Sequence, residues 1–194
     1  MAGTDTTRPN ITGGPAIVLV RPQLGENIGT AARAMANFGL SELRIVDPRD
    51  GWPSEGARKA ASGANWVIDG ARVFASTQEA IADLSLVLAT TARQRDMRKQ
   101  VLGPQAAADV LHAREGAGAH CGILFGGERA GLDNEDISLA DAILTYPVNP
   151  AFASLNLAQA VLLIAYEYAR GSDPDAGRMS CIDYAGNEPA TRAE

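Results

Sequence analysis

Between Gly122 and Glu167 the chain opens with GILFGGERAGL (residues 122–132) and continues with AILTYPVNPAFASLN (residues 142–156). Each part starts with a short apolar run and then breaks into glycine, or into proline and small polar residues. Short continuous apolar runs are typical of buried parallel strands, and in an open α/β sheet the ligand crevice lies at the carboxyl ends of the strands. Two such strand ends, the second leading into an apolar helix that ends near Arg170, predict the floor of a binding site.

Further apolar runs predict the rest of a parallel sheet. These strands are expected at 17–20, 43–46 and 86–89, with a shorter one over 67–68 and 71–74. Helices are expected between them at 27–38, 57–61, 77–84 and 106–114. The alternation predicts one Rossmann-like α/β domain over residues 15–171, with helices on both faces of a parallel sheet. Loose polar tails are expected at 1–14 and 172–194.

The helix expected from Asn27 to Phe38 has an asparagine suited to an N-cap, and Gly39 is suited to end it. Its buried stripe at helical spacing consists of Ile28, Ala31, Ala32, Met35 and Phe38. Arg33 falls on the opposite, polar side, where a solvated surface arginine is the plain interpretation. Because this helix directly follows the first strand, at the ligand end of the sheet, a functional arginine also fits the position.

Composition excludes several classes of protein. The chain has 17 basic and 23 acidic residues and a net charge of −6, which argues against a general nucleic-acid clamp. Cys121 and Cys181 have neither metal-site spacing nor disulfide density, which favours the reducing cytoplasm. His112 and His120 are the only histidines, so no metal site is expected. No apolar run approaches the roughly 20 residues of a membrane span, and the polar N-terminus does not resemble a signal peptide.

Three motifs also carry a resemblance to a known family. They are ENIGTAARAMANFG (26–39), FGGERAGL (125–132) and YPVNPAFASLNLAQA (146–160). In this order they resemble the signature motifs of the SpoU-type 2′-O-ribose RNA methyltransferases of the SPOUT class, and most of all the tRNA anticodon-loop enzymes of the TrmJ group. The resemblance runs from about Ile17 to about Arg170, which is most of the chain.

The resemblance implies a C-terminal trefoil knot that binds S-adenosylmethionine in a bent form through backbone groups of three loops. The cofactor-binding residues that it implies are Thr90, Thr91, Ala92, Gly126, Tyr146, Pro147, Val148, Ala153, Ser154 and Leu155. A dinucleotide-binding fold is the competing interpretation. It is disfavoured because the first strand–helix turn, GENIG at 25–29, lacks the G-x-G-x-x-G spacing.

The same resemblance implies a catalytic Arg33 that reaches the cofactor of the partner in a homodimer. The residues implied to orient the ribose or the catalytic loop are Asn27, Glu128, Ser154 and Asn156. Since arginine is a poor proton acceptor, we expect Arg33 to stabilise charge on the attacking 2′-oxygen and to anchor phosphate. Taken alone, Glu128 equally fits a structural acid that caps a turn or pairs with Arg129, and Ser154 fits a helix N-cap.

The final helix also favours a homodimer, because its apolar stripe is wider than a surface helix needs. The stripe consists of Leu155, Ala158, Leu162 and Ala165 on one side and Leu157, Val161, Ile164 and Tyr168 on the next. Residues 93–99 contain four basic residues and one acid, a local excess of +3. Such a run is usually a solvated loop, but it follows a strand end beside the expected cofactor. The alternative is an RNA-facing patch of Arg93, Arg95, Arg98 and Lys99.

The leading hypothesis is therefore S-adenosylmethionine-dependent methylation of a ribose 2′-hydroxyl in RNA, with tRNA as the first candidate and rRNA as the second. A catalytically inactive SPOUT-like RNA-binding or assembly protein is the alternative, and a nucleotide-dependent oxidoreductase is a third. Close relatives in the family carry a C-terminal RNA-binding extension. We therefore expect this acidic chain to be a catalytic domain with weak RNA affinity of its own.

Overall fold

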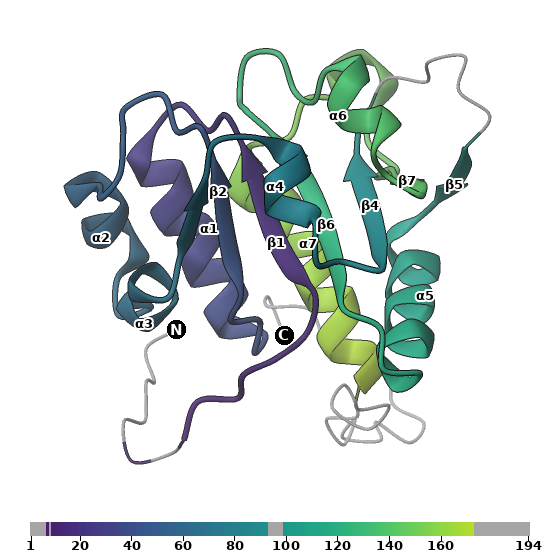
Figure 1. Cartoon of the computed structure of the whole chain (residues 1–194), viewed down its shortest axis with the longest axis horizontal. Helices are drawn as coiled ribbons and strands as arrows, with labels where there is room; N and C mark the ends of the chain where they lie inside the picture. The colour runs from purple at the N-terminus through teal and green to yellow at the C-terminus, as the bar shows by residue number, and fades with distance from the viewer. Residues whose placement is uncertain (1–6, 8, 93–98, 173–194) are drawn as a thin grey trace, which may run out of the picture.

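The computed structural model describes residues 7, 9–92 and 99–172, and within them seven parallel strands form one sheet. The strand order is β3-β2-β1-β6-β4-β7-β5, and each neighbouring pair is parallel (Figure 1). The strands are β1 (Ala16–Val20), β2 (Leu43–Val46), β3 (Arg72–Phe74), β4 (Leu86–Thr90), β5 (Gln100–Leu102), β6 (Cys121–Gly126) and β7 (Ala142–Leu144). The predicted parallel α/β sheet is confirmed.

Helices cover both faces of this sheet, as predicted. They are α1 (Gly25–Asn37), α2 (Glu55–Ala61), α3 (Asn65–Asp69), α4 (Thr77–Ile81), α5 (Pro104–Gly116), α6 (Asn134–Ser138) and α7 (Leu157–Ser172), with a 3-10 turn η1 (Pro150–Phe152). Side chains of a strand alternate between the two faces. Ile17 and Leu19 therefore pack in the core under α1, α2, α3, α5 and α7, whereas Val18 and Val20 pack under α4 and α6, in front in Figure 1. None of the helices in the described ranges is long and apolar enough to cross a membrane.

The predicted runs at 17–20, 43–46 and 86–89 are β1, β2 and β4, but the predicted strand at 67–68 is wrong. Those two residues lie in α3, which buries both against the core. An isolated pair of apolar residues fits one helical turn as well as a strand, so periodicity could not decide. The predicted helix at 77–84 ends already at Ile81. The pattern also missed β5, where only Leu102 is buried, and the short polar helix α6.

The start of α1 also differs from the prediction. The helix begins at Gly25 with Leu24 as its N-cap, so Asn27 lies inside the first turn. The carboxylate of Glu128 accepts hydrogen bonds from the backbone amides of Gln23 (2.8 Å) and Leu24 (3.4 Å). A residue 104 positions away in sequence from Leu24 therefore holds the turn before α1. Gly39 has a φ of 76°, a left-handed conformation suited to the predicted helix end.

A charged cluster lies at the amino-terminal end of the sheet, opposite the expected site. Arg44 of β2 is fully buried and pairs with Glu42 (Nε–Oε1 2.9 Å) and Asp83 (Nη2–Oδ2 2.9 Å). His120 approaches the other oxygen of Glu42 at 2.8 Å, and Arg72 also pairs with Glu42. The hydrogen bond from Arg44 is the main cause that lowers the pKa of Asp83 to about 2. Because two guanidinium groups already neutralise these carboxylates, we assign no metal ion to the cluster.

Candidate active site

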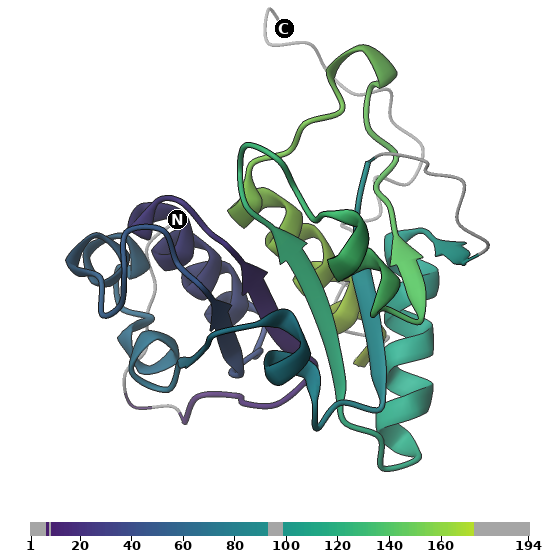
Figure 2. The same ribbon diagram turned by 45° about the horizontal axis from the view of Figure 1, so that its top comes forward.

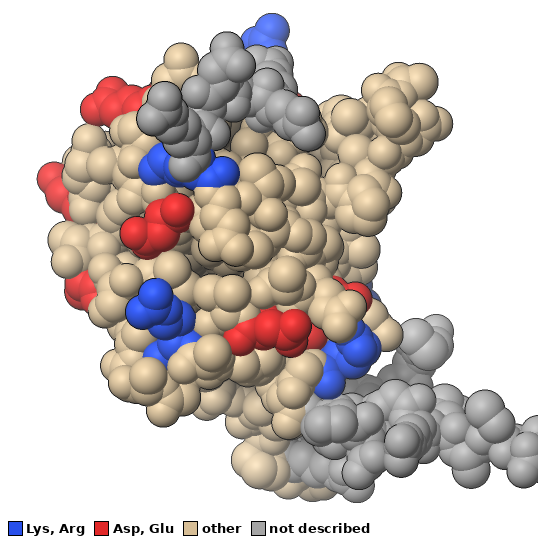
Figure 3. Space-filling view, turned by 90° about the vertical axis from the view of Figure 1, so that its right-hand side faces the viewer, with Lys and Arg blue, Asp and Glu red and all other residues tan. Residues whose placement is uncertain are grey.

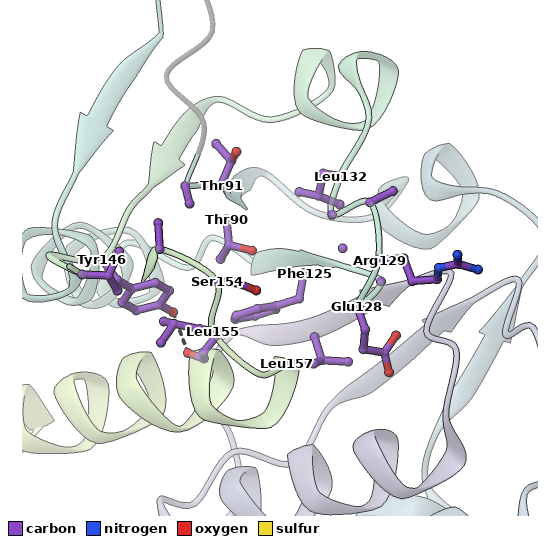
Figure 4. Close-up of a pocket in the computed structure, with 18 residues that line it drawn as sticks. Thr90, Thr91, Phe125, Glu128, Arg129, Leu132, Tyr146, Ser154, Leu155 and Leu157 are labelled. Atoms are coloured by element: carbon purple, nitrogen blue, oxygen red, sulfur yellow. Dashed lines mark hydrogen bonds between the residues drawn. The ribbon is translucent and has the colours of Figure 1, made fainter. Parts of the chain in front are cut away.

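A cavity of about 350 Å³ opens at the carboxyl ends of β4, β6 and β7 (Figure 4). This volume falls within the usual range of small-molecule sites, roughly 300–1,000 Å³. Three segments line it: residues 90–92 after β4, 125–132 after β6, and the stretch from Tyr146 to Ala160 that leads into α7. The loops after β6 and β7 rise above the carboxyl edge of the sheet (Figure 2).

The cavity combines apolar walls with exposed backbone, which suits a flat heterocyclic ligand. Its large apolar lining residues are Phe125, Leu132, Tyr146, Val148, Leu155 and Leu157. Tyr146 donates a hydrogen bond from its hydroxyl to the carbonyl of Ala160 (2.6 Å). Burial raises the pKa of this hydroxyl, so Tyr146 stays neutral and serves as a wall. The hydroxyl of Thr90 donates to the Leu124 carbonyl (2.8 Å), and Ser154 points into the cavity (Figure 4).

The loop at 127–132 folds back over the end of β6. A Cβ atom at Gly126 would overlap the backbone of Gly131 and Leu132, so only glycine allows this approach. Gly131 has a φ of 68°, in the left-handed region. Gly127 and Gly131 form an isolated antiparallel bridge that closes the loop. The glycines of FGGERAGL thus shape one wall of the cavity with backbone.

A hydrogen-bonded chain of three side chains lies at the rim of the cavity. Asn27 donates from Nδ2 to Oε1 of Glu128 (2.6 Å), and its Oδ1 accepts from Nδ2 of Asn156 (3.1 Å). Asn156 also accepts a hydrogen bond from the backbone amide of Ala158 (2.9 Å), so Asn156 rather than Ser154 satisfies the start of α7. This chain joins the three sequence motifs in one place.

Glu128 is the acceptor at one end of this chain, and Asn27 lies at its centre. Burial alone would raise the pKa of its carboxyl, but hydrogen bonds from Asn27 and from backbone amides outweigh that effect and lower it. A carboxylate with a lowered pKa is a poor proton acceptor near neutral pH. Arg129 follows Glu128 in sequence, but its side chain points away from the cavity and forms no ion pair with Glu128 (Figure 4). Of the two structural roles open from sequence, holding a turn is therefore the one observed.

The structure gathers most of the predicted cofactor residues around one cavity. Of those ten residues, Pro147 alone is not among the lining residues. Glu128, predicted as an orienting residue, also lines the cavity, and the lining residues outside the predicted site are Phe125, Gly127, Arg129, Ala130, Gly131, Leu132, Leu157 and Ala160. Most of them lie in the FGGERAGL motif, so extending the prediction over the whole motif would have found them.

Arg33 and the predicted RNA-binding run lie elsewhere. Arg33 is exposed on α1, does not line the cavity, and has no hydrogen-bond or ion-pair partner among the described residues. Lys99 donates to the carbonyls of Ser138 (2.7 Å) and Ala140 after α6. Arg93, Arg95 and Arg98 lie outside the described residues. On the side that carries α5 and β5, acidic and basic side chains of the described residues are interspersed (Figure 3).

The protein has a ligand-sized cavity with a polar rim at the carboxyl edge of its parallel sheet. This arrangement is typical of α/β proteins that bind a small molecule at that edge. The SpoU rRNA Methylase family model matches residues 14–166, and the chain belongs to that family. Relatives include the Pseudomonas aeruginosa protein named tRNA (cytidine/uridine/adenosine-2′-O-)-methyltransferase TrmJ, 40% identical over 78% of this chain and 58% of that protein. LasT of Escherichia coli, named an uncharacterized tRNA/rRNA methyltransferase, is 38% identical over 79% of this chain and 67% of its own length.

The crystal structure of TrmJ from Z. mobilis superimposes with a TM-score of 0.77 at 53% sequence identity. The match covers 93% of this chain and 74% of that one. This likeness places the sheet, the helices and the cavity loops in the family fold. The chain spans 58% of the length of the Pseudomonas relative and 67% of LasT.

Proposed function

We propose that the protein is an S-adenosylmethionine-dependent methyltransferase that methylates a ribose 2′-hydroxyl in RNA, with tRNA as the first candidate substrate. The single observation that carries the proposal is the chain Asn156–Asn27–Glu128 at the rim of the cavity. It ties the three motif segments together where a ligand and a substrate ribose would meet. Family membership and the names of the relatives support the same reaction.

The cavity residues fit this cofactor. Phe125, Leu155 and Tyr146 offer apolar faces for an adenine. Residues 90–92 and 126–131 bring backbone groups to the cavity for its polar edge, although the amides of Thr91 and Gly131 are already bonded to the carbonyls of Leu144 and Gly127. When bound, S-adenosylmethionine supplies an electrophilic methyl group. The protein must then orient a ribose hydroxyl towards that methyl group and exclude water, and positioning provides most of the rate. We assign this orientation to Asn27, Asn156 and Ser154; Glu128 holds Asn27, and Asn27 in turn holds Asn156.

We propose that Arg33 acts in the cavity of a second copy in a homodimer. Within its own chain Arg33 does not line the cavity, yet it lies on α1, which packs beside α7. Alongside it α7 exposes Leu162 (39%), Leu163 (40%) and Tyr166 (49%), more apolar surface than a monomer needs. Tyr166 also contacts Phe38 of α1 edge to face at 5.8 Å. A dimer built on α1 and α7 would cover this surface and bring Arg33 to a partner.

Several finer features of the family belong to the same proposal. The chain leaves β7, which lies between β4 and β5, and α7 then packs against α1 and α5 on the opposite face from α6. This route is compatible with the trefoil knot, which we propose for the segment after β6. We also propose a cytoplasmic location, RNA contacts by residues 93–99, and one domain at 15–171 flanked by tails at 1–14 and 172–194.

The test is methylation of total RNA with labelled S-adenosylmethionine, followed by localisation of the modified ribose. Arg33→Ala should leave the free energy of unfolding within about 0.5 kcal/mol and leave cofactor affinity unchanged. Methylation should fall by a factor on the order of 100 or more, the scale for losing a preorganised charge-stabilising group. Arg114→Ala, at an exposed arginine of α5, is the control and should keep full activity. Full activity of Arg33→Ala would show that Arg33 takes no part in methyl transfer.

Mixing two inactive variants tests whether Arg33 acts across the dimer. Ser154→Trp fills the cavity, and Arg33→Ala lacks the arginine. Exchanged subunits should form one hybrid site with both parts intact and recover part of the activity. No recovery despite proven subunit exchange would place Arg33 in the site of its own chain. The inactive RNA-binding alternative is separated by calorimetry, since a protein without catalysis need not bind S-adenosylmethionine.

A further inference from the structure

Arg21 holds an unusual backbone conformation directly after β1. Its φ is 49°, in the left-handed region that residues with a side chain rarely adopt. Its amide donates to the Val46 carbonyl of β2 at 2.8 Å, which fixes this turn to the sheet. An uncommon conformation of this kind persists only where its surroundings require it. The surroundings of Arg21 are the two ends of the cavity loop at 127–132.

The first end of the loop rests on the backbone of Arg21. A Cβ atom at Gly127 would overlap the carbonyl oxygen of Arg21, so the loop leaves β6 in direct contact with this turn. Further along the turn, after Pro22, the backbone amides of Gln23 and Leu24 donate hydrogen bonds to Glu128. The turn after β1 therefore contacts the start of the loop through the carbonyl of Arg21 and through the amides of Gln23 and Leu24, which bind the Glu128 carboxylate.

The other end of the loop is held by the side chain of the same arginine. The guanidinium group pairs with Asp133 (Nη2–Oδ2 3.0 Å) and with Asp136 of α6. Asp136 is only 5% exposed at its side chain, and its second oxygen accepts a hydrogen bond from Thr77 of α4 (2.7 Å). Asp133 is the N-cap of α6 and accepts the amide of Asp136 at 2.9 Å. Through Asp133 and Asp136, Arg21 thus connects this end of the loop to α6 and, by way of Thr77, to α4.

Between these anchors the loop is closed on itself by the hydrogen bond from the Gly131 amide to the Gly127 carbonyl (2.9 Å). Arg129, Ala130 and Gly131 are exposed, and Leu132 is the buried residue of the segment. Yet the whole segment lines the cavity. The position of this closed loop over the cavity therefore depends on where its two ends are fixed, and Arg21 contacts both ends.

We propose that Arg21 is a positioning residue that preorganises the 127–132 loop for the ligand of the cavity. The identity of that ligand, S-adenosylmethionine, rests on the proposed function. Loss of the guanidinium group frees the α6 end of the loop while the contact at Gly127 remains. The loop then samples conformations that do not bind, and the apparent affinity falls by the fraction of time spent in them.

The test compares Arg21→Gln, Arg21→Lys and Asp133→Asn with Arg58→Gln. Arg58 forms an exposed pair with Asp69 in the α2–α3 region, away from the cavity, and is the matched control. Asparagine is a good N-cap, so Asp133→Asn keeps the helix start and removes a charge that Arg21 contacts. Two readouts are needed: hydrogen exchange of the peptide covering 127–133 without cofactor, and calorimetric affinity for S-adenosylmethionine.

Arg21→Gln should speed exchange in the 127–133 peptide about five- to tenfold and weaken cofactor affinity by a similar factor, the scale of losing charge-assisted hydrogen bonds. Exchange in β1, β2 and β6 should stay unchanged, which a general loss of stability would not allow. Arg21→Lys should recover part of the affinity, because one ammonium can pair with one carboxylate at a time. Unchanged exchange in Arg21→Gln would overturn the positioning role. Absence of cofactor binding by the wild type would instead overturn the proposed function.

Discussion

Asn27→Asp should reverse the pH dependence of the rim network. In the wild type, the side-chain amide of Asn27 donates to Glu128 at 2.6 Å. Asparagine and aspartate have the same shape, so the variant places a second carboxylate beside Glu128 and removes the donor. Two carboxylates this close cannot both ionise without a large cost, so the pair takes up a proton and its pKa is raised.

The magnitude follows from Coulomb's law with partial solvent access. Two unit charges about 4 Å apart, at an effective dielectric constant of about 40, repel by about 2 kcal/mol. A carboxyl group whose pKa is higher in the folded than in the unfolded state stabilises the fold at pH values below its unfolded pKa. That stabilisation is lost as the pH rises through the pKa of the folded state. Asn27→Asp should therefore lose about 2 kcal/mol of unfolding free energy between pH 4 and pH 8. Glu128 in the wild type has a lowered pKa and contributes the opposite slope, losing stability as the pH falls.

Urea unfolding of the wild type, Asn27→Asp and Asn27→Ala at pH 4 and pH 8 measures this difference. The alanine variant lacks the donor but adds no charge, so it should lose about 1–2 kcal/mol at both pH values. Its pH dependence should keep the sign of the wild type. An Asn27→Asp profile parallel to that of the wild type would show that residues 27 and 128 are not in contact.

Three further outcomes are expected. Arg44→Met should destabilise the protein by about 1.5–3 kcal/mol in urea unfolding, because it removes the hydrogen bonds of a fully buried arginine to Glu42, Asp83 and the Ala80 carbonyl, although Arg72 still pairs with Glu42; a loss below about 1 kcal/mol would contradict the buried pair. The pKa of Asp83, lowered from 3.8 to about 2 mainly by Arg44, contributes stability that should disappear as the pH falls from 4 to 2 in the wild type but not in Arg44→Met. Gly131→Ala, at a φ of 68° with no atom within 4 Å of the added Cβ, should cost about 1 kcal/mol of stability from backbone strain alone. Gly126→Ala should cost more, because its Cβ would overlap the backbone of Gly131 and Leu132. Equal losses of stability in thermal unfolding would contradict this close approach.

The strands were predictable from sequence because central parallel strands are continuous apolar runs. β1 and β4 were placed to within a residue at each end. The three-residue edge strand β5 and the five-residue helix α6 were not predicted, since each is too short to show a period. α6 depends instead on its capping residues Asp133 and Asp136, a signal that a search for apolar periodicity does not see.

The site was predictable as a set of loops but not as a set of contacts. Asparagine is a residue type suited to an N-cap, but α1 begins two residues before Asn27. The side chain of Asn27 instead hydrogen-bonds Glu128 in the rim network. Glu128 could have paired with Arg129 on local grounds, but it meets the turn after β1 instead. Contacts of this kind join residues about 100 positions apart. These contacts depend on how the loops are arranged in the folded protein, which local sequence does not reveal.

The double attachment of Glu128 has a consequence for communication across the molecule. The residue lies in a loop that lines the cavity and, through Gln23, Leu24 and Asn27, holds the start of α1. A ligand that shifts Glu128 would therefore also shift the start of α1. A partner that binds α1 more tightly in the held position must raise the affinity of the cavity, and the ligand of the cavity raises that of the partner by the same factor.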